Sequence, residues 1–339
     1  MSILITGGAG YIGSHMAINL LDAGEQVVVL DNLSTGYEWA VPRGAELVIG
    51  NADDQKLVAK LIKDKKIEAV IHFAGSIVVP DSIADPLGYY ANNTVVSRAL
   101  IESAVKGGVK NFIFSSTAAV YGLPENNPVK ETARLAPISP YGSSKMMTEI
   151  MLADAAVAHD LRYVALRYFN VAGADPAGRS GQSTPQATHL IKVACQTALD
   201  KRPHIDVFGA DYPTPDGTCV RDYIHVSDLV RAHRDALAYL RGNGASQVFN
   251  CGYGRGFSVK EVIAAVKRVS GIDFTVRQVD KRPGDPASLI AGAGRIKEVL
   301  SWQPQLDDLD TIVAHALDWE RHLIERKSKA SNSRKLVGA

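Results

Sequence analysis

The sequence predicts an α/β protein built on a doubly wound parallel sheet, with a smaller, mixed α/β region in its C-terminal half. The first half of the chain alternates short apolar segments with amphipathic helical patterns, which is typical of repeated β-α-β units. The apolar segments are hydrophobic nearly throughout, as expected for strands covered on both faces of a sheet. This alternation ends after Asn170, where a less regular pattern begins.

Six strands and four helices are predicted in the first half. The strands are expected at Ile3–Thr6, Val27–Leu30, Glu46–Ile49, Ala69–Phe73, Asn111–Ser115 and Tyr163–Arg167. The helices between them are expected near Tyr11–Ala23, Asp54–Lys63, Val95–Lys106 and Ser143–His159. In such a sheet the ligand-facing loops begin at the carboxyl ends of the strands.

The second half is expected to open with a loop over Gly173–Pro185, which is rich in Gly, Ser, Pro and Asp. Helices are expected near His189–Asp200, Ser227–Leu240, Ser258–Val269 and Leu309–Glu325, and short strands near Ile205–Phe208 and Val248–Cys251. The polar, basic segment from Lys327 to Ala339 is expected to be frayed. The predicted domains are therefore residues 1–171 (joined by part of 220–251) and 172–326, followed by a flexible tail over 327–339.

Composition excludes several classes of partner. With 339 residues, 46% of them hydrophobic, the chain can bury a large core. A net charge of +1 gives no overall attraction to nucleic acid or to an anionic membrane. The N-terminus lacks the layout of a secretory signal, and no apolar run approaches the ~20 residues that span a bilayer. Cys195, Cys219 and Cys251 have no metal-site spacing, so we expect no metal and reduced thiols in a cytosolic protein.

A glycine-rich turn follows the first predicted strand. Gly7, Gly10 and Gly13 have the spacing G-x-x-G-x-x-G at the start of a helix. Such glycines let the backbone approach a pyrophosphate at the helix N-terminus, where free N–H groups and the helix dipole favour anions. Asp31 closes the second strand, where a carboxylate can accept both hydroxyls of an adenosine ribose. No basic residue follows it, which favours NAD over NADP. The alternative is an ordinary β-α-β turn with a capping aspartate.

Tyr141 and Lys145 are four residues apart and share one face of a predicted helix. A free tyrosine has a pKa of about 10 and is a poor base at neutral pH. We expect the ammonium of Lys145, together with an oxidised nicotinamide, to lower the pKa of Tyr141 and to make it a general base. Thr117, at the end of the strand that begins at Asn111, can relay the proton or fix a substrate hydroxyl. The alternatives are a chance pair on a surface helix and a threonine that caps a loop.

These motifs together resemble the extended short-chain dehydrogenase/reductases, and nearly the whole chain is similar to UDP-glucose 4-epimerases. The similar stretches are Thr6–His15, His72–Gly75, Phe112–Gly122, Ser139–Lys145, Arg167–Asn170, Asp211–His225 and Arg282–Asp285. The resemblance implies a Rossmann fold, NAD as cofactor, a UDP-sugar as substrate and a homodimer. It also implies epimerisation at C4 of a UDP-hexose through a transient 4-keto intermediate.

The resemblance implies a role for each matching residue. Tyr141 would be the base, Thr117 its hydroxyl partner, and Lys145 the lysine that holds the nicotinamide ribose and tunes the pKa of the base. The implied NAD site comprises Gly7, Gly10, Tyr11, Ile12, Gly13, Asp31, Asn32, Ser34, Thr35, Gly36, Asn51, Ala52, Phe73, Ala74, Gly75, Tyr141, Lys145 and Tyr168. The implied substrate contacts are Thr117, Tyr141, Asn170, Phe208, Arg221, Arg282 and Asp285. Guanidinium groups match phosphate oxygens in geometry and charge, which suits a diphosphate clamp.

The chain departs from the family pattern at several positions. Asn51 replaces an aspartate that bonds the adenine amine, and Ile77 replaces a lysine near the NAD pyrophosphate. The segment Pro185–Leu190 lacks the usual Asn-Asn-Leu, which leaves the uracil contacts there open. Leu289 stands at a variable position near the sugar and leaves tolerance of an N-acetyl group open. Cys219 replaces a glycine and is expected to act as a small apolar residue.

Competing functions remain within the same fold. Sugar-nucleotide 4,6-dehydratases carry Asp-Glu after the active-site threonine, but here Ala118 and Ala119 follow it, which disfavours dehydration. Decarboxylation of UDP-glucuronate and 4-epimerisation of UDP-GlcNAc, UDP-xylose or UDP-glucuronate remain open. Arg255 or His189 near a C6 carboxylate would favour a uronate. A non-catalytic NAD-binding scaffold is disfavoured because both Tyr141 and Lys145 are present.

One face of the Tyr141 helix carries apolar side chains that suit a second copy of the chain. They are Met146, Met147, Ile150 and Met151. The resemblance implies a dimer built from this helix and the one near Val95–Lys106. The alternative is that these side chains belong to the interior of a single subunit. The preferred sugar, the direction of flux, the pathway and copurification of NAD are not determined by the sequence.

Overall fold

The computed structural model describes residues 1–184, 187–282 and 284–337, and side chains as far as residue 328. Its centre is a seven-stranded sheet in the order β10-β6-β5-β4-β1-β2-β3. Every neighbouring pair is parallel. The strands are β1 (Ser2–Thr6), β2 (Gln26–Asp31), β3 (Glu46–Ile49), β4 (Ile67–His72), β5 (Asn111–Thr117), β6 (Arg162–Tyr168) and β10 (Gln247–Cys251). The predicted doubly wound parallel fold is confirmed.

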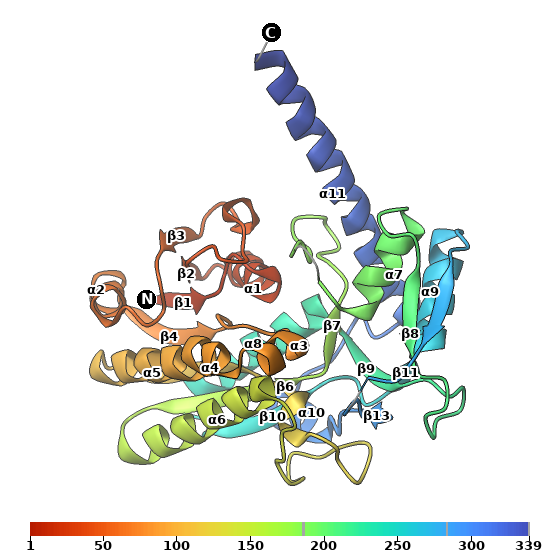
Figure 1. The fold of residues 1–339 in the computed structure, drawn as a ribbon. Coiled ribbons are helices and arrows are strands. Elements are labelled where there is room, and N and C mark those ends of the chain that lie inside the picture. Colours follow the sequence, from red (N-terminus) through yellow and green to blue (C-terminus); the bar gives the residue numbers. More distant parts are fainter. Residues whose placement is uncertain (185–186, 283, 338–339) are drawn as a thin grey trace.

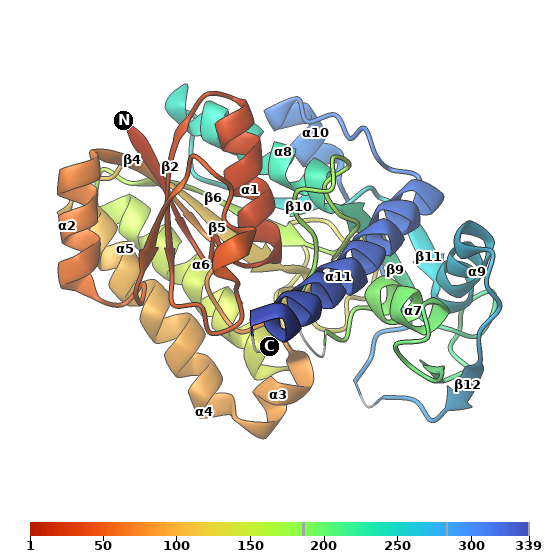
Figure 2. The same cartoon turned by 90° about the horizontal axis from the view of Figure 1, so that it is seen from above.

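Helices cover both faces of this sheet (Figure 2). One face carries α1 (Tyr11–Asp22) and α8 (Val226–Arg241), which pack against each other. The other face carries α2 (Gln55–Lys65), α5 (Val96–Lys106) and α6 (Pro140–Ala158). Successive strand residues alternate between two cores, so that Ile3 and Ile5 join one cluster and Leu4 joins the other. This alternation explains why the strands are apolar at nearly every position.

The second region contains two small sheets that the sequence predicted only in part. In the larger one, β9 (Val220–His225) pairs with β7 (Asn170–Ala172), β11 (Gly256–Ser258) and β13 (Ser288–Leu289). In the smaller one, β8 (Ile205–Phe208) pairs with β12 (Val276–Val279). Three helices pack beside them: α7 (Leu190–Ala198), α9 (Val259–Ser270) and α11 (Leu309–Val337). A short α10 (Gly294–Leu300) lies against β10. The domain limits drawn from the sequence stay a prediction.

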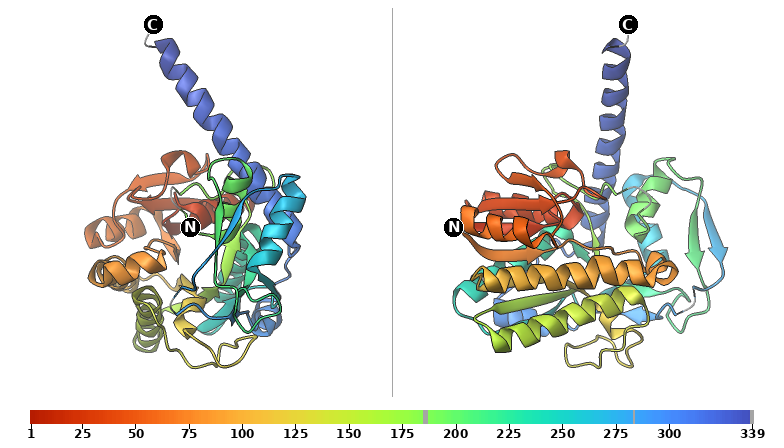
Figure 3. Two further views of the ribbon diagram at one scale, coloured as in Figure 1. Left: turned by 45° about the vertical axis from the view of Figure 1, so that its right-hand side comes forward. Right: turned by 60° about the vertical axis from the view of Figure 1, so that its left-hand side comes forward.

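The end of α11 differs from the prediction. The sequence placed the end of this helix near Glu325 and a frayed segment from Lys327, whereas the helix continues to Val337. Figures 1 and 3 show its last turns projecting beyond the rest of the molecule. The segment is polar but contains neither Gly nor Pro before Gly338, and it is rich in Lys and Arg, which favour helix. Polarity alone was therefore a poor reason to end the helix.

Several short helices near the carboxyl edge of the sheet were not predicted. Before α5 come α3 (Val79–Ala84), α4 (Pro86–Tyr89) and a π-helix, η2 (Tyr90–Val95). The 3-10 turns η1 (Glu38–Ala40) and η3 (Ala118–Tyr121) follow β2 and β5. Among the described residues, no helix combines the length and the apolar character that a membrane span requires.

Candidate active site

The turn after β1 has the geometry that the glycine spacing predicted. Gly7 has φ of +72°, and a Cβ there would lie 2.6 Å from the backbone nitrogen of Ala74. A Cβ on Gly13 would lie 2.2 Å from the carbonyl oxygen of Gly7. Gly10 caps α1 without a side-chain hydrogen bond, so the first N–H groups of this helix are available to an anion. The turn therefore fits the pyrophosphate of a dinucleotide.

Asp31 ends β2 beside this turn and is buried. Its two carboxylate oxygens accept hydrogen bonds from the backbone N–H groups of Ala9 at 2.9 Å and of Leu33 at 2.8 Å. The sequence predicted only that they would accept ribose hydroxyls. Each carboxylate oxygen can accept a second bond, so both roles are compatible. Asn51 was predicted to accept a hydrogen bond from the adenine amine. In the structure its side-chain oxygen accepts a hydrogen bond from the side-chain amide of Asn32 at 2.9 Å.

The loop after β2 folds back over the glycine turn. The N–H of Ser34 donates to the side-chain oxygen of Asn32 at 3.0 Å, and the N–H of Tyr37 donates to the carbonyl of Ala9 at 3.0 Å. A Cβ on Gly36 would lie 2.9 Å from Ala9, so this close approach requires glycine. A hollow lies between the turn and the loop, lined by Ala9, Gly10, Tyr11, Ser14, Thr35, Tyr37, Ala40, Gly181, Ser183 and Thr184. The structure therefore brings together Gly10, Tyr11 and Thr35, three residues of the predicted NAD site.

The segment after β4 also lies beside the glycine turn. The N–H of Phe73 donates to the carbonyl of Thr6 at 3.0 Å, which places Phe73 and the following residues beside the glycine turn. Gly75 has φ of +152°, and a Cβ there would lie 3.0 Å from the side-chain oxygen of Asn93. Asn93 accepts the N–H of Ser76 at 2.8 Å and donates to the carbonyl of Ser76 at 2.9 Å. Asn93 was not predicted, because no sequence motif marks it. Its π-helical backbone, a frequent feature of functional sites, is visible only in the structure.

Tyr141 lies in the first turn of α6, and Thr117 ends β5. Ser139 caps this helix by accepting the N–H of Gly142 at 3.2 Å, and Pro140 occupies the first turn, where its missing N–H costs nothing. The Thr117 hydroxyl lies near enough to the Tyr141 phenol to lower its pKa, and it also accepts the N–H of Ala119 at 3.1 Å. Loss of solvation outweighs this effect and raises the pKa of Tyr141 to about 12.

Lys145 is buried one turn further along α6. Only 3% of its surface is exposed, and its ammonium donates to the carbonyl of Ser115 at 2.9 Å. It also lies 5.0 Å from the centre of the Phe114 ring. Burial lowers the pKa of Lys145 to about 8. The predicted lowering of the Tyr141 pKa by this ammonium together with an oxidised nicotinamide stays a prediction, and desolvation of the phenol is the effect that their positive charge has to overcome.

Four of the seven predicted substrate residues form a connected group around β9. Arg221 pairs with the carboxylate of Asp285, and the guanidinium of Arg282 lies 3.7 Å from the centre of the Phe208 ring. The N–H of Asp285 donates to the carbonyl of Arg282 at 3.3 Å. Leu289 in β13 pairs in register with Arg221, beside this group. The structure therefore brings together two guanidiniums, a carboxylate and an aromatic ring from three separate segments.

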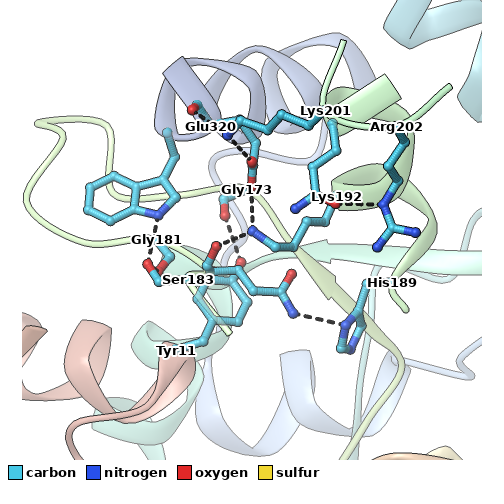
Figure 4. A network of polar contacts seen from close by, with 12 residues as sticks. Tyr11, Gly173, Gly181, Ser183, His189, Lys192, Lys201, Arg202 and Glu320 are labelled. Carbon is cyan, nitrogen blue, oxygen red and sulfur yellow. Dashed lines mark hydrogen bonds and ion pairs between the residues drawn. The ribbon is translucent and has the colours of Figure 1, made fainter. Parts of the chain in front are cut away.

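Asn170 and His189 lie in a second hollow, between β7, α7 and α11. The side-chain amide of Asn170 donates to the carbonyl of Asp222 at 3.3 Å. His189 precedes α7, and its Nδ1 accepts the amide of Gln182 at 2.9 Å (Figure 4). The hollow is lined by Asn170, Val171, Ala172, Gly173, Gln182, His189, Leu190, Ile191, Lys192, Tyr223, Ala316, Trp319 and Glu320. Of the segment predicted to have altered uracil contacts, Pro185 and Gln186 lie outside the described residues.

Arg255, the other candidate for a carboxylate contact, is held elsewhere. Its guanidinium donates to the carbonyl of Asp307 and lies 4.9 Å from the centre of the Phe257 ring. Cys219 is buried next to Tyr212 and Arg221, and burial raises the pKa of its thiol. That environment agrees with its expected role as a small apolar residue.

Comparison with known proteins agrees with this geometry. A profile of the NAD dependent epimerase/dehydratase family matches residues 3–252, and the chain belongs to this family. It is 56% identical over 328 residues to the UDP-glucose 4-epimerase of Azospirillum brasilense, across 97% of this chain and 94% of that protein. The predicted family and NAD dependence are confirmed.

Solved structures extend the similarity to three dimensions. The UDP-glucose 4-epimerase of Brucella ovis in complex with NAD aligns with a TM-score of 0.91 at 43% identity, over 94% of this chain and 97% of that one. The UDP-glucose 4-epimerase of Bifidobacterium longum in complex with NAD⁺ and UDP aligns with a TM-score of 0.90 at 35% identity, over 95% and 98%. The similarity therefore includes both the parallel sheet and the smaller region that holds the arginine group.

Proposed function

We propose that this chain epimerises a UDP-hexose at C4, interconverting UDP-glucose and UDP-galactose through a transient 4-keto sugar. The observation that carries the proposal is the placement of Tyr141 near the Thr117 hydroxyl and one helical turn before the buried Lys145. This group lies at the carboxyl edge of the sheet, where β1, β4 and β5 also present the glycine turn, the Phe73 segment and Thr117.

The residues of the chain then have distinct roles. Bound NAD supplies a reversible hydride acceptor for C4, and its oxidised form, with the Lys145 ammonium, adds positive charge that favours a phenolate at Tyr141. Tyr141 takes the proton of the sugar 4-hydroxyl. It returns this proton to the oxygen at C4 after the sugar has rotated in the site. Thr117 holds that hydroxyl within reach of the phenol. Lys145 holds the nicotinamide ribose, and Gly7, Gly10, Gly13 and Asp31 hold the rest of the dinucleotide.

The arginine group anchors the nucleotide end of the substrate. Arg221 and Arg282 bind the diphosphate from two sides. Phe208 contacts the uracil, and Asp285 accepts a hydrogen bond from a hydroxyl of the uridine ribose. Anchoring the diphosphate leaves the sugar free to rotate, and binding energy from the remote UDP keeps the 4-keto intermediate in the site. Asn170 lies at the edge of this region and is proposed to bond the diphosphate.

A neutral hexose is favoured over a uronate. The two candidates for binding a C6 carboxylate are engaged by other groups, Arg255 by Asp307 and His189 by Gln182. Leu289 lies beside Arg221 and is the residue that would limit the size of the sugar substituents. We therefore do not propose a second substrate. Three alternative sugars are included in the assay for comparison: UDP-GlcNAc, UDP-xylose and UDP-glucuronate.

A homodimer in the cytoplasm that serves galactose metabolism completes the proposal. Four apolar side chains on neighbouring helices support self-association, with exposures of 78% for Leu87, 57% for Val95, 39% for Met147 and 51% for Ile150. Met146 and Met151, also predicted at this face, pack against the interior cores and contribute less. Sedimentation at micromolar concentration would disprove the dimer if it gave only monomer.

The test of the proposed activity is an NMR assay of the purified protein with each of the two UDP-hexoses and no added reductant. We expect either sugar to convert to the same equilibrium mixture. UDP-GlcNAc, UDP-xylose and UDP-glucuronate form a comparison panel. Absence of interconversion in a protein that binds NAD would support the scaffold alternative, and faster turnover of another panel member would replace the substrate.

A further inference from the structure

Behind the proposed nicotinamide site, Tyr168 contacts a buried histidine from α8. The Tyr168 hydroxyl donates to Nε2 of His233, whose side chain has no exposed surface. The ring of His233 also lies 5.0 Å, centre to centre, from the ring of Phe73. His233 thus touches two residues that the sequence placed in the NAD site, although it belongs to the second half of the chain.

The second ring nitrogen of His233 fixes the direction of this bond. Nδ1 lies 2.9 Å from the carbonyl oxygen of Leu229, which can only accept, so Nδ1 carries the proton. Burial lowers the pKa of His233 to about 4, so the ring is neutral and Nε2 is an acceptor. The phenol of Tyr168 must therefore donate to His233 and cannot turn its proton toward the cofactor.

Tyr168 lies beside the strand that holds Lys145. It ends β6, where it pairs in register with Thr117 of β5. The Ser115 side chain lies near enough to the Tyr168 phenol to oppose the rise in its pKa that burial causes, and the carbonyl of Ser115 accepts a hydrogen bond from the Lys145 ammonium at 2.9 Å. His233 therefore contacts Tyr168 directly, and Tyr168 lies against the end of β5 that positions Lys145.

We propose that His233 is a positioning residue for the reaction, acting through Tyr168 on the nicotinamide wall and on Lys145. The inference rests on the proposed function. By fixing one orientation of the Tyr168 phenol, His233 holds in place the surface against which the dinucleotide packs. Through Tyr168 it also positions the Ser115 carbonyl, which accepts the hydrogen bond from Lys145. It therefore affects kcat and the retention of NAD, whereas UDP-sugar binding depends on the separate arginine group at Arg221 and Arg282.

The test is a double-mutant cycle on the holoenzyme with His233→Leu, Tyr168→Phe and the double variant. We expect His233→Leu to lower kcat about tenfold, the usual cost of a buried hydroxyl losing its partner. NAD dissociation, followed by exchange with labelled NAD, is expected to become about tenfold faster, with KM for the UDP-sugar unchanged. Since His233 acts through Tyr168, adding His233→Leu to Tyr168→Phe should change neither quantity further. His233→Gln, which offers an acceptor near Nε2, should recover most of the loss.

Three results would overturn the proposal: wild-type kcat and NAD exchange in His233→Leu, an equal further loss when Tyr168 is already Phe, or a change in KM alone. The second result would mean that His233 acts by packing, and thermal unfolding of each variant reports that packing separately. If the wild-type protein holds NAD but does not interconvert UDP-hexoses, the proposed function fails. The NAD-exchange cycle would still decide the role of His233.

Discussion

The ammonium of Lys145 donates to the carbonyl oxygen of Ser115 at 2.9 Å, and Tyr141 lies one turn earlier on α6, near the Thr117 hydroxyl. Lys145 is buried and Tyr141 is half-buried, and loss of solvation moves both pKa values toward the neutral forms, to about 8 for the lysine and about 12 for the tyrosine. A phenolate at Tyr141 therefore forms only when positive charge is placed beside it. This arrangement ties the strength of the base to occupancy of the cofactor site.

Replacing the base should remove most of the activity. We expect Tyr141→Phe to lower kcat by a factor of about 10² to 10⁴, the usual contribution of general acid–base catalysis. NMR interconversion of UDP-glucose and UDP-galactose is the measurement. Tyr163→Phe is the matched control, since it removes another mostly buried phenol outside the site and should leave kcat near the wild-type value. Turnover of Tyr141→Phe close to that control would reject Tyr141 as the base.

The buried lysine should make stability depend on pH. Between pH 8 and 10 the unfolded chain holds a proton on Lys145 that the folded protein has released, so the free energy of unfolding rises with pH by about 3 kcal/mol. Above pH 10 the raised pKa of Tyr141 acts in the opposite direction, because the folded protein then keeps a proton that the unfolded chain loses. Below pH 8 the charged lysine destabilises the fold.

Denaturant unfolding of the NAD-free protein and of Lys145→Met can measure this effect. At pH 7 we expect Lys145→Met to be inactive but more stable than the wild type, as often occurs when a strained functional residue is removed. The difference should shrink as the pH rises from 8 to 10. Lys60→Met, an exposed lysine on α2, should show no such trend. A difference between wild type and Lys145→Met that does not change with pH would contradict the assignment.

Much of the fold was predictable because local sequence determines it. The strands of the parallel sheet are apolar nearly throughout, and the structure has each predicted strand of the first half within two residues of its expected limits. Five strands of the second region, β7, β9, β11, β12 and β13, were not predicted. β7, β11 and β13 have only two or three residues each, and their pairing with β9 depends on tertiary contacts. The end of α11 was wrong because a polar, basic composition was taken as a sign of fraying.

The residues of the candidate site also fall into two groups, those that local sequence identifies and those that it does not. Gly13, Tyr141 and Lys145 belong to short motifs whose spacing carries their chemistry, so the sequence alone identified them. Asn93 and His233 carry no such motif, and their partners are distant in sequence, with 65 residues separating His233 from Tyr168. The sequence did not predict that desolvation would raise the pKa of Tyr141, because its burial depends on the packing of the whole site, which no local pattern reports.

The close packing of the glycine turn predicts that a Cβ added at Gly13 will weaken NAD binding. A Cβ on Gly13 would lie 2.2 Å from the carbonyl of Gly7, so Gly13→Ala must displace the turn that holds the pyrophosphate. We expect the purified variant to contain little NAD and to show at least about tenfold weaker binding. Gly294→Ala, where an added Cβ meets nothing within 4 Å, is the matched control and should retain NAD. NAD content equal in the two variants would show that the turn does not hold the dinucleotide.

Arg282 and Arg255, two of the arginines that lie over phenylalanine rings, should behave differently. Arg282→Met should raise KM for the UDP-hexose by about ten- to a hundredfold with a small change in kcat, because charge-assisted bonds to the diphosphate are made in ground and transition states alike. Arg255→Met removes a guanidinium that is also placed over a ring, 4.9 Å from the centre of Phe257, and should leave KM unchanged. If both variants raised KM equally, general loss of positive charge would be the better explanation.

The buried ion pair that lines part of the second hollow should matter for stability. Glu320 and Lys192 are paired with side-chain exposures of 3% and 5%, and Lys201 donates to the other oxygen of Glu320 at 2.8 Å (Figure 4). Glu320→Leu leaves the buried ammonium of Lys192 uncompensated and should cost about 3 to 5 kcal/mol, measured by denaturant unfolding. Asp211→Ala breaks an exposed pair with Lys281 and should cost at most about 1 kcal/mol.

Removing both members of the buried pair separates the cost of an unpaired charge from the value of the pair. The variant Lys192→Met with Glu320→Leu replaces two buried ions by apolar groups, and the hollow beside them is lined largely by Val171, Ala172, Leu190 and other apolar residues. We expect it to be more stable than Glu320→Leu alone, because the desolvation penalty of the lysine disappears with the charge. If the double variant were the less stable of the two, the attraction between Lys192 and Glu320 would not explain the effect, and packing of their aliphatic stems would be the dominant contribution.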